Sequence, residues 1–315
     1  MERQTTRYVF MVRPHHFGPN EQTAASNAFQ QPSDRPLTQL REQALREFDA
    51  MTAALRSAGI TPIVFEDTDE PVKPDAVFPN NWVSFHADGR VFLYPMEAVA
   101  RRAERRLDII EALSVEWGFR VSEIVDLSAF ESDGLFLEGT GSMVLDRVGH
   151  VAYAALSSRT HMDALADFAQ RADYEITAFE ARDAGGQRVY HTNVMMALGE
   201  KFAVICSESI VDANKRAAVL DRIAGSGRDI VEITREQMRN FGGNLLELSS
   251  DSGDPVTVLS RRAHDSFNAE QRERISGFTR LLPTDVGTIE RIGGGGARCM
   301  LGEIFLPLDE PEAVA

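Results

Sequence analysis

Hydrophobic residues follow two alternating patterns along the chain, short strand-like runs and longer amphipathic segments. Between about residues 38 and 59, apolar side chains recur every three or four positions, which marks one face of a helix. A strand-like run, TPIVFED, comes directly after this segment. The residues that we expect on the buried face of this helix are Leu37, Leu40, Ala44, Phe48, Met51 and Leu55.

The same order of elements returns along the rest of the chain. A strand, an amphipathic helix and a second strand make a unit of roughly fifty residues, which is typical of a repeat architecture. In the second unit we expect one helix over residues 101–119, and in the fifth an extended stretch that ends near residues 288–291. The pattern predicts an α/β fold with pseudo-fivefold strand–helix–strand repeats.

A tight polar or glycine-bearing segment precedes an apolar strand in each repeat. With Asn81, Gly141, Asn193 and Asn244 as anchors, the intervals are 60, 52 and 51 residues. The fifth such segment, around Cys299, has no helix after it, while the first helix of the chain has no such segment before it. These complementary ends predict a ring that closes by pairing the last strand with the first unit.

Equivalent segments of five units around one axis meet at one end of that axis. We therefore expect Asn81, Glu138, His191, Asn193 and Cys299 to line one central pocket. A cysteine, a histidine and a glutamate at one point are a nucleophile, a proton carrier and an orienting group. The glycines in IGGGGARCM allow the backbone to approach a ligand closely and to adopt positive φ.

Strand alternation adds two expectations about side-chain direction. His191 and Asn193 are two residues apart, so on an extended segment both face the pocket. By the same rule Arg298 points away from the face that Cys299 uses. The other cysteine, Cys206, lies within the apolar run KFAVICSES and is expected to be a buried core residue.

Composition narrows the class of protein. The chain has 315 residues, 43% of them hydrophobic, and no apolar run long enough to span a membrane. A net charge of −15 argues against nucleic acid as a partner, since phosphate binding needs a basic surface. Two cysteines without a CxxC pair predict neither a disulfide framework nor zinc, and no signal peptide is evident, so we expect a cytoplasmic protein. The sequence does not decide whether the chain forms a homo-oligomer.

Four motifs resemble those of the pentein superfamily, the five-bladed α/β propellers that modify guanidines: FPNNW (78–82), FLEGTGSM (136–143), YHTN (190–193) and GGGGARCM (293–300). The likeness covers nearly the whole chain and implies one catalytic domain over residues 1–315. It is strongest to the branch of citrulline utilisation hydrolases. It implies that Cys299 is the nucleophile, His191 the general acid/base and Glu138 the carboxylate of the site, with no metal or organic cofactor.

The sequence departs from the arginine deiminases at two positions. Those enzymes carry aspartates where this chain has Asn81 and Asn193, and the aspartates bind the substrate guanidinium. An amide offers one acceptor and two donors, which matches a neutral ureido group better than a cation. We therefore expect a ureido amino acid, most simply citrulline, as substrate. Asp75 is a candidate for binding its α-ammonium group, or is an exposed loop carboxylate.

Other interpretations stay open at this stage. An arginine deiminase, a dimethylarginine dimethylaminohydrolase or an amidinotransferase uses the same fold and the same three residues. A translation initiation factor has this propeller without catalysis, so a non-enzymatic binding protein is a further alternative. Glu138 could be a simple turn carboxylate, and the glycine run a flexible linker.

Overall fold

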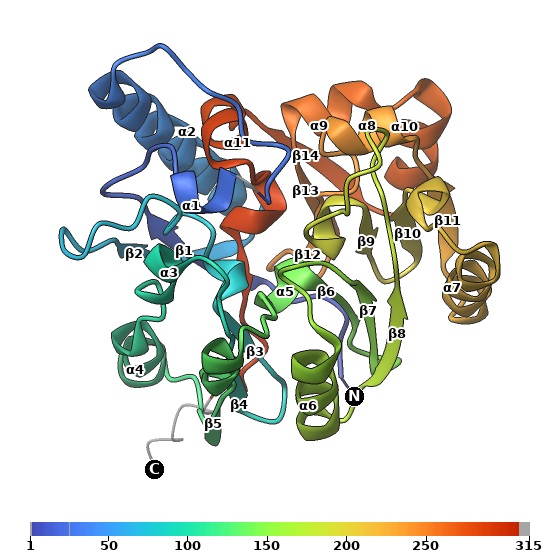
Figure 1. Cartoon of the computed structure of the whole chain (residues 1–315), viewed down its shortest axis with the longest axis horizontal. Helices are drawn as coiled ribbons and strands as arrows, with labels where there is room; N and C mark the ends of the chain where they lie inside the picture. Colours follow the sequence, from blue (N-terminus) through green and yellow to red (C-terminus); the bar gives the residue numbers. More distant parts are fainter. Residues whose placement is uncertain (1, 25, 309–315) are drawn as a thin grey trace.

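The computed structural model describes residues 2–24 and 26–308 and arranges them as five small sheets around a centre (Figure 1). Each sheet has three strands. In the order in which the strands pair, the sheets are β15 (Gly302–Glu303), β1 (Tyr8–Arg13) and β2 (Thr61–Glu66); β3 (Val83–Phe85), β4 (Arg90–Leu93) and β5 (Glu123–Asp126); β6 (Met143–Asp146), β7 (Val151–Ala155) and β8 (Glu175–Phe179); β9 (Met196–Leu198), β10 (Phe202–Ile205) and β11 (Asp229–Glu232); and β12 (Leu246–Ser249), β13 (Pro255–Ser260) and β14 (Arg280–Thr284).

Every sheet has the same internal topology. The inner strand pairs antiparallel with the middle strand, and the middle strand pairs parallel with the outer one, as β3, β4 and β5 do. A parallel pair needs a long crossover, and in each unit helical segments supply it on the outside of the ring (Figure 1). The five predicted strand–helix–strand repeats are confirmed.

The ring closes between the two ends of the chain. β15 pairs antiparallel with β1, which places Val9 opposite Glu303 and Phe10 opposite Gly302. β15 thus takes the inner position in the first sheet, the position that β3 holds in the second. The predicted closure by the last strand and the first unit is confirmed.

Helices cover the outer side of the sheets. The face predicted for the first long helix is buried except for Leu37, which is 44% exposed because it begins the helix. None of the helices in the described part of the chain is long and apolar enough to cross a membrane. The α-helices are α1 (Glu21–Ala24), α2 (Leu37–Ser57), α3 (Val99–Arg102), α4 (Leu107–Val115), α5 (Gly139–Ser142), α6 (Met162–Ala172), α7 (Ala213–Gly225), α8 (Arg235–Arg239), α9 (Arg261–Ser266), α10 (Ala269–Ser276) and α11 (Gly287–Gly293).

The expected continuous helix over residues 101–119 is wrong, because two short helices, α3 and α4, replace it. The break follows Arg101, whose side chain turns inward and forms a bidentate ion pair with Glu104 at 2.8 and 2.9 Å. Both side chains are almost completely buried. The spacing of the apolar residues predicts a helix with these charged side chains on its exposed face. Because the pair is buried instead, the helix does not continue through this segment.

The expected extended stretch is confirmed as β14, but its expected end near residues 288–291 is wrong, because the strand ends at Thr284 and these residues belong to α11. The carboxylate of Glu47, on α2, accepts hydrogen bonds from the first backbone N–H groups of α11, those of Thr288 and Ile289. Glu47 therefore caps α11 from a helix more than two hundred residues away in sequence. Gly294, with φ of 70°, ends α11 in the left-handed conformation that favours glycine.

Candidate active site

The glycine-bearing and polar segments of the five units meet at the centre of the ring. They are short turns rather than extended strands: η1 (Pro79–Asn81), α5, η3 (Thr192–Val194), the turn of residues 241–245 and η5 (Ala297–Met300). Each leads directly into the inner strand of its sheet. Because a turn replaces a strand, strict alternation does not decide which side chains face the centre.

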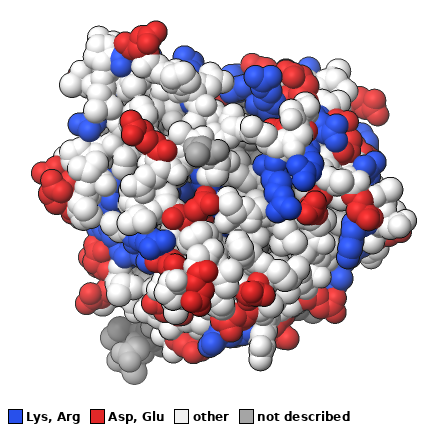
Figure 2. All heavy atoms as spheres, in the orientation of Figure 1, with Lys and Arg blue, Asp and Glu red and all other residues white. Residues whose placement is uncertain are grey.

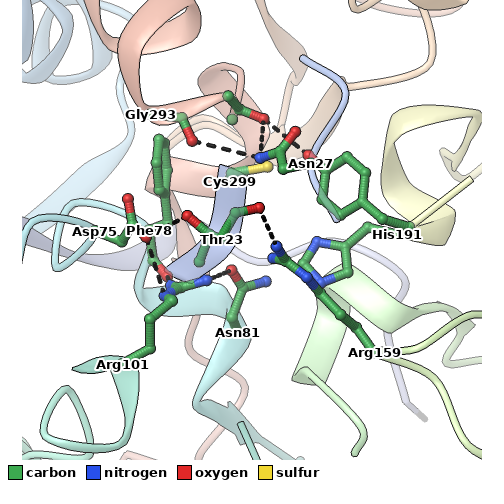
Figure 3. Close-up of a pocket in the computed structure, with 13 residues that line it drawn as sticks. Thr23, Asn27, Asp75, Phe78, Asn81, Arg101, Arg159, His191, Gly293 and Cys299 are labelled. Carbon is green, nitrogen blue, oxygen red and sulfur yellow. Dashed lines mark hydrogen bonds and ion pairs between the residues drawn. The ribbon is translucent and has the colours of Figure 1, made fainter. Parts of the chain in front are cut away.

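A small pocket lies where these turns meet (Figure 3). Cys299, His191, Asn81 and Asp75 line it. Glu138 and Asn193 lie directly behind this wall, against the imidazole and the sulfur respectively. All of these side chains are at most 3% exposed. Neither Asp75 nor Glu138 is therefore an exposed loop carboxylate, and the glycine run is a buried wall of the pocket rather than a linker.

His191 and Glu138 form a buried hydrogen-bonded pair, with 2.8 Å between Nε2 and Oε2. Burial would raise the pKa of Glu138, but Arg159, His191 and Arg101 together hold it below its usual range. Burial lowers the pKa of His191 to about 4 in spite of Glu138. An ionised carboxylate only accepts, so Nε2 carries the proton and donates it, which leaves the lone pair of the neutral ring on Nδ1.

The anchor Gly141 packs against this histidine. A Cβ atom at Gly141 would lie 2.8 Å from Nδ1 of His191 and 2.3 Å from Nδ2 of Asn81. Both distances are shorter than van der Waals contact, so the close approach of the α5 turn to these two side chains requires a glycine. The packing of the site thus requires a glycine at this anchor position.

Two amides point at the sulfur of Cys299. Nδ2 of Asn244 lies 3.3 Å and Nδ2 of Asn193 3.6 Å from Sγ. The orientation of the Asn244 amide follows from its other contacts: Oδ1 accepts from the backbone N–H of Arg298 at 3.2 Å, and Nδ2 donates to the carbonyl of Asn193 at 3.0 Å. Asn244 therefore presents an N–H donor to the sulfur. Burial raises the pKa of Cys299, and the hydrogen bond from Asn244 works against this rise.

The expectation that His191 and Asn193 both face the pocket is wrong for Asn193. Asn193 lies in the η3 turn, not on an extended strand, so its side chain packs behind Cys299. Its Oδ1 is buried and has no hydrogen-bond partner among the described residues. Arg298 points away from the pocket as predicted and pairs with Glu303 at 3.0 Å.

Arg101 is the first pocket residue that sequence reasoning missed. Its NH1 donates to Oδ1 of Asn81 at 2.8 Å, and Asp75 lies 3.8 Å from its Nε. Oδ1 of Asn81 therefore accepts from a cation, and Nδ2 has only a long contact of 3.5 Å, to the carbonyl of Glu138. Arg101 stands in the run RRAERR, where nothing local separates it from solvated arginines.

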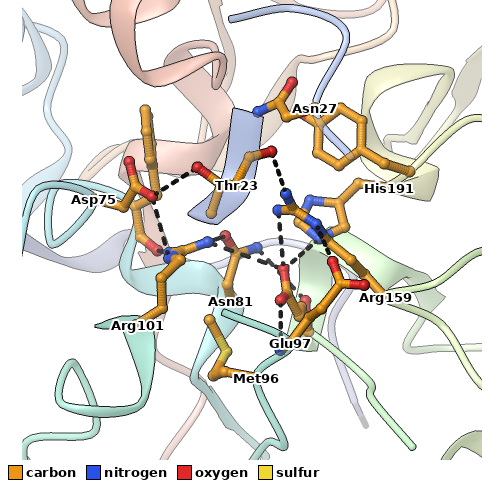
Figure 4. A network of polar contacts seen from close by, with 12 residues as sticks. Thr23, Asn27, Asp75, Asn81, Met96, Glu97, Arg101, Arg159 and His191 are labelled. Carbon is orange, nitrogen blue, oxygen red and sulfur yellow. Dashed lines mark hydrogen bonds and ion pairs between the residues drawn. The ribbon is translucent and has the colours of Figure 1, made fainter. Parts of the chain in front are cut away.

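Arg159 is the second missed cation (Figure 4). It is 2% exposed, and its NH1 lies 3.4 Å from Oε2 of Glu138. Its other nitrogens donate to the hydroxyl of Ser26 at 2.7 Å, to the carbonyl of Thr23 at 3.1 Å and to Glu97 at 3.2 Å. A lone arginine after a strand carries no local signal of this role.

The segment around α1 covers the pocket, and we call its described residues, 20–24 and 26–31, the lid. Asn20 donates to Asp75 at 2.8 Å, Asn27 to the carbonyl of Gly294 at 3.1 Å and Gln30 to the carbonyl of Gly293 at 3.2 Å. With the lid in this position the pocket leaves about 20 Å³ for the centre of a water molecule. That is room for about one water, so a larger molecule can enter only if residues that line the pocket move.

Comparison with protein families gives one match along nearly the whole chain. A sequence model described as "N,N dimethylarginine dimethylhydrolase, eukaryotic" matches residues 13–306. No curated protein matches the chain.

Solved structures share the fold at low sequence identity. ArgZ, an arginine dihydrolase from the ornithine–ammonia cycle in cyanobacteria, matches in its apo form with a TM-score of 0.72 and 18% identity over 96% of this chain. The chain spans only 41% of full-length ArgZ. It spans 99% of the ArgZ N-terminal domain in a cysteine-to-serine variant bound to substrate. That structure matches with a TM-score of 0.70 and 18% identity over 95% of this chain.

A histidine variant of dimethylarginine dimethylaminohydrolase, an adduct with S-methyl-L-thiocitrulline, matches with a TM-score of 0.64 and 15% identity. The match covers 96% of this chain and the whole of that one. These likenesses show the fivefold propeller fold of the pentein enzymes.

Proposed function

The chain belongs to the family described as N,N dimethylarginine dimethylhydrolase, within the pentein superfamily, and from this premise we propose that it is a cysteine-dependent hydrolase of a ureido or guanidino C–N bond. We propose that the chain acts as one catalytic domain. Its preferred substrate is citrulline, which it converts to ornithine, carbon dioxide and ammonia. The observation that carries the choice of head group is the hydrogen bond from Arg101 to Oδ1 of Asn81.

This hydrogen bond orients the Asn81 amide, because Oδ1 accepts from the Arg101 guanidinium and Nδ2 is left as the free donor. A ureido oxygen accepts from such a donor, whereas a guanidinium would have to share Oδ1 with the positive charge of Arg101. Asn193 was expected to bind the same group, but it lies behind the sulfur and does not line the pocket, so we assign its contact to Cys299 alone. Asn81 thus offers N–H donors to the oxygen of a neutral head group.

Cys299 and His191 carry the first half of the reaction. Because the resting thiol and imidazole are both neutral, the thiol proton moves to Nδ1 of His191 as Sγ attacks the ureido carbon. Asn81 stabilises the charge that develops on the oxygen. Glu138, hydrogen-bonded to Nε2, stabilises the imidazolium. His191 then gives its proton to the departing nitrogen, ornithine leaves, and a carbamoyl group stays on Sγ.

Water completes the turnover. His191, neutral again, takes a proton from one water molecule, the oxygen attacks the S-carbamoyl carbon, and the thiol is regenerated. The carbamic acid that is released decomposes to carbon dioxide and ammonia. One water is consumed per citrulline, and the chain's own residues hold or move every proton.

Asp75 and Arg159 are suited to the amino-acid end of the substrate. Oδ1 of Asp75 is buried and has no partner among the described residues, so it can accept from an α-ammonium group. Arg159 has its guanidinium in the pocket wall, bound to the lid through Ser26 and Thr23. A substrate carboxylate can replace these lid contacts with a charge-assisted bidentate pair.

A guanidino substrate is the second candidate function. It is favoured by the two buried carboxylates Asp75 and Glu138 and by the arginine dihydrolase that shares the fold. An arginine deiminase, a dimethylarginine hydrolase or an amidinotransferase belongs to this alternative. A non-catalytic binding protein has no use for a buried His191–Glu138 pair beside a cysteine, so it is the weaker choice.

A panel assay tests the proposal. Citrulline, arginine, methylated arginines and agmatine are each incubated with the protein, and ammonia, ornithine and citrulline are quantified. We expect ornithine and ammonia from citrulline, with no turnover by Cys299→Ser, and a mass increase of Cys299 that corresponds to a carbamoyl group in quenched samples. Release of an alkylamine from methylated arginines, with citrulline inert, contradicts the proposal. A reaction that proceeds only when an amine is added to accept the transferred group identifies a transferase.

A further inference from the structure

A second cavity lies on the outer side of the lid. It has a volume of about 300 Å³ and is lined by the lid residues Ala28, Phe29 and Gln31 together with α8 and α9. Figure 2 shows basic side chains gathered on the face where Figure 1 places these two helices. Three arginines line the cavity, Arg235, Arg239 and Arg262, and we call it the arginine groove.

Two of the three arginines come from α8, and the third contacts the end of this helix. Arg235 and Arg239 are four residues apart and therefore lie on one face of this helix. Arg262, on α9, donates to the carbonyl of Arg239 at 3.3 Å and to Oδ1 of Asn240 at 2.9 Å. Nε of Arg235 is buried and has no hydrogen-bond partner among the described residues. The NH2 group of Arg235 donates to the carbonyl of Glu208, so one donor of this guanidinium, Nε, is left unused by the described residues.

Within the described part of the chain, the acidic residues that line the groove form their hydrogen bonds with groups other than the three arginines. Asp183 and Glu236 also line it. Asp183 accepts from the backbone of Gln187 at 2.9 Å, and Glu236 accepts from Asn240 at 3.3 Å. Three cations against two anions leave an excess of positive charge, in a chain whose net charge is −15. Guanidinium groups in such a concave site are suited to a carboxylate or phosphate ligand.

A row of aromatic rings joins the groove to the active site. The guanidinium of Arg262 lies 5.6 Å from the ring centre of Phe241, which lies 4.9 Å from that of Phe29 on the lid. Phe29 lies 5.9 Å from Tyr190, and Tyr190 lies 4.6 Å from the ring of His191. A ligand in the groove therefore touches the same lid residue that packs against the pocket.

The turn after α8 makes a second connection. The carbonyl of Phe241 accepts from the backbone N–H of Asn244 at 2.8 Å, and Asn244 donates to the sulfur of Cys299. Phe241 has a φ of 62°, in the left-handed region that is unfavourable for a phenylalanine. The end of the helix that carries two groove arginines thus leads straight into the turn that contacts Cys299.

We propose that the arginine groove is an effector site for a small, multiply charged oxyanion, and that its occupancy holds the lid closed. A ligand shifts an equilibrium only by its differential affinity for the two states. In the structure the lid residues form one wall of the groove, so an anion bound there favours this closed position of the lid. Because that state leaves no room for an amino acid, the anion inhibits entry to the pocket.

Binding is tested with pyrophosphate and with citrate, which separate phosphate from carboxylate ligands. Isothermal titration at constant ionic strength compares the wild type with Arg235→Gln/Arg239→Gln. The matched control is Arg261→Gln, whose side chain lies 3.4 Å from Asp285 and does not line the groove. We expect saturable binding of at least one probe by the wild type and the control, weakened at least tenfold in the double variant. Absent binding, or binding that the double variant retains, overturns the proposal.

Coupling to the lid is tested by the alkylation rate of Cys299 with iodoacetamide, with the buried Cys206 as internal reference. A saturating probe should slow labelling of Cys299 several-fold in the wild type and in Arg261→Gln, and leave the rate of the double variant unchanged. An equal change in all three proteins is a general salt effect and contradicts the coupling. Alkylation needs no turnover, so this result stands whether or not citrulline is the substrate.

Discussion

Amides occupy the positions around Cys299 where carboxylates would bind a cation. Oδ1 of Asn81 accepts a hydrogen bond from Arg101, while Asn193 and Asn244 direct N–H groups at the sulfur. This arrangement stabilises negative charge on sulfur or on a substrate oxygen without adding charge to a buried site. The buried carboxylate nearest to the reacting groups, Glu138, is already paired with His191 and Arg159.

The first residue-scale prediction concerns Asn81→Asp. A carboxylate has no N–H for the ureido oxygen, so we expect kcat/KM for citrulline to fall by about tenfold or more, the loss of one hydrogen bond to a charged group. The ratio of kcat/KM for arginine to that for citrulline should rise. Steady-state kinetics with both substrates checks this. The matched control is Asn214→Asp, the same change at an exposed position of α7, which should leave both values unchanged.

The second prediction concerns the pH dependence of Cys299. Since burial raises the pKa of this thiol, its alkylation rate in the substrate-free protein should still increase between about pH 7 and pH 9. Asn244→Asp removes an N–H donor and adds a negative charge, so the profile should move to higher pH. Asn244→Ser keeps a donor and should move it less. Profiles that coincide for all three proteins would show that Asn244 does not act on the sulfur.

Short turns, rather than the strands themselves, place the reacting groups. η3 carries Asn193, η5 carries Cys299, and α5 approaches His191 so closely that Gly141 cannot bear a side chain. α11 leads into η5 through the glycine run, and Glu47 caps its first turn from α2. The position of Cys299 therefore depends on the contact between α2 and α11.

Removal of this cap should destabilise the protein. Glu47→Ala leaves the first N–H groups of α11 without an acceptor in a buried place, at a cost of about 1–2 kcal/mol in the free energy of unfolding. Urea unfolding measures it. Glu42→Ala, an exposed residue on the same helix, is the control and should change stability by less than about 0.5 kcal/mol. Equal stability of both variants would mean that the cap is not needed.

The elements that sequence reasoning missed have a common physical cause. Repeats of apolar runs and turn-forming residues are local, so five units and their anchors could be predicted from them. The inward turn of Arg101 and Arg159 depends on partners such as Glu104 and Ser26 that are fixed only by folding. The cap of α11 and the lid over the pocket depend on similarly remote contacts, and no local pattern records them.

At the scale of the whole molecule, the ring needs both ends of the chain. β15 completes the sheet of β1 and β2, so the segment that carries Cys299 also closes the propeller. The central charges come from several units: Glu138, His191 and Arg101 are separated along the chain but lie together at the axis. Folding and assembly of the site are therefore one event.

Because folding builds the buried pair, stability should depend on pH. The folded protein lowers the pKa of His191 to about 4, while the unfolded chain protonates it near 6.5. The unfolded state thus binds more protons between these values, and stability falls as the pH is lowered from about 6.5 to about 4. Glu138, with a depressed pKa, adds to this loss at still lower pH.

Urea unfolding as a function of pH checks this expectation. The wild type should lose stability more steeply than His191→Gln in that window, by up to about 1.4 kcal/mol per pH unit, the slope for one proton. His264→Gln, outside the pocket, serves as the control. Parallel slopes for the wild type and His191→Gln would contradict a neutral buried His191.

The preference for a neutral head group is tested most directly by competition. Equal concentrations of citrulline and arginine, each with a different isotopic label, react with limiting protein in one vessel, and labelled ornithine and citrulline are followed over time. We predict that ornithine forms first from the citrulline label, with a ratio of kcat/KM of at least tenfold over arginine. Faster consumption of arginine, with its label appearing in citrulline, would contradict the assignment of Asn81 to a ureido group.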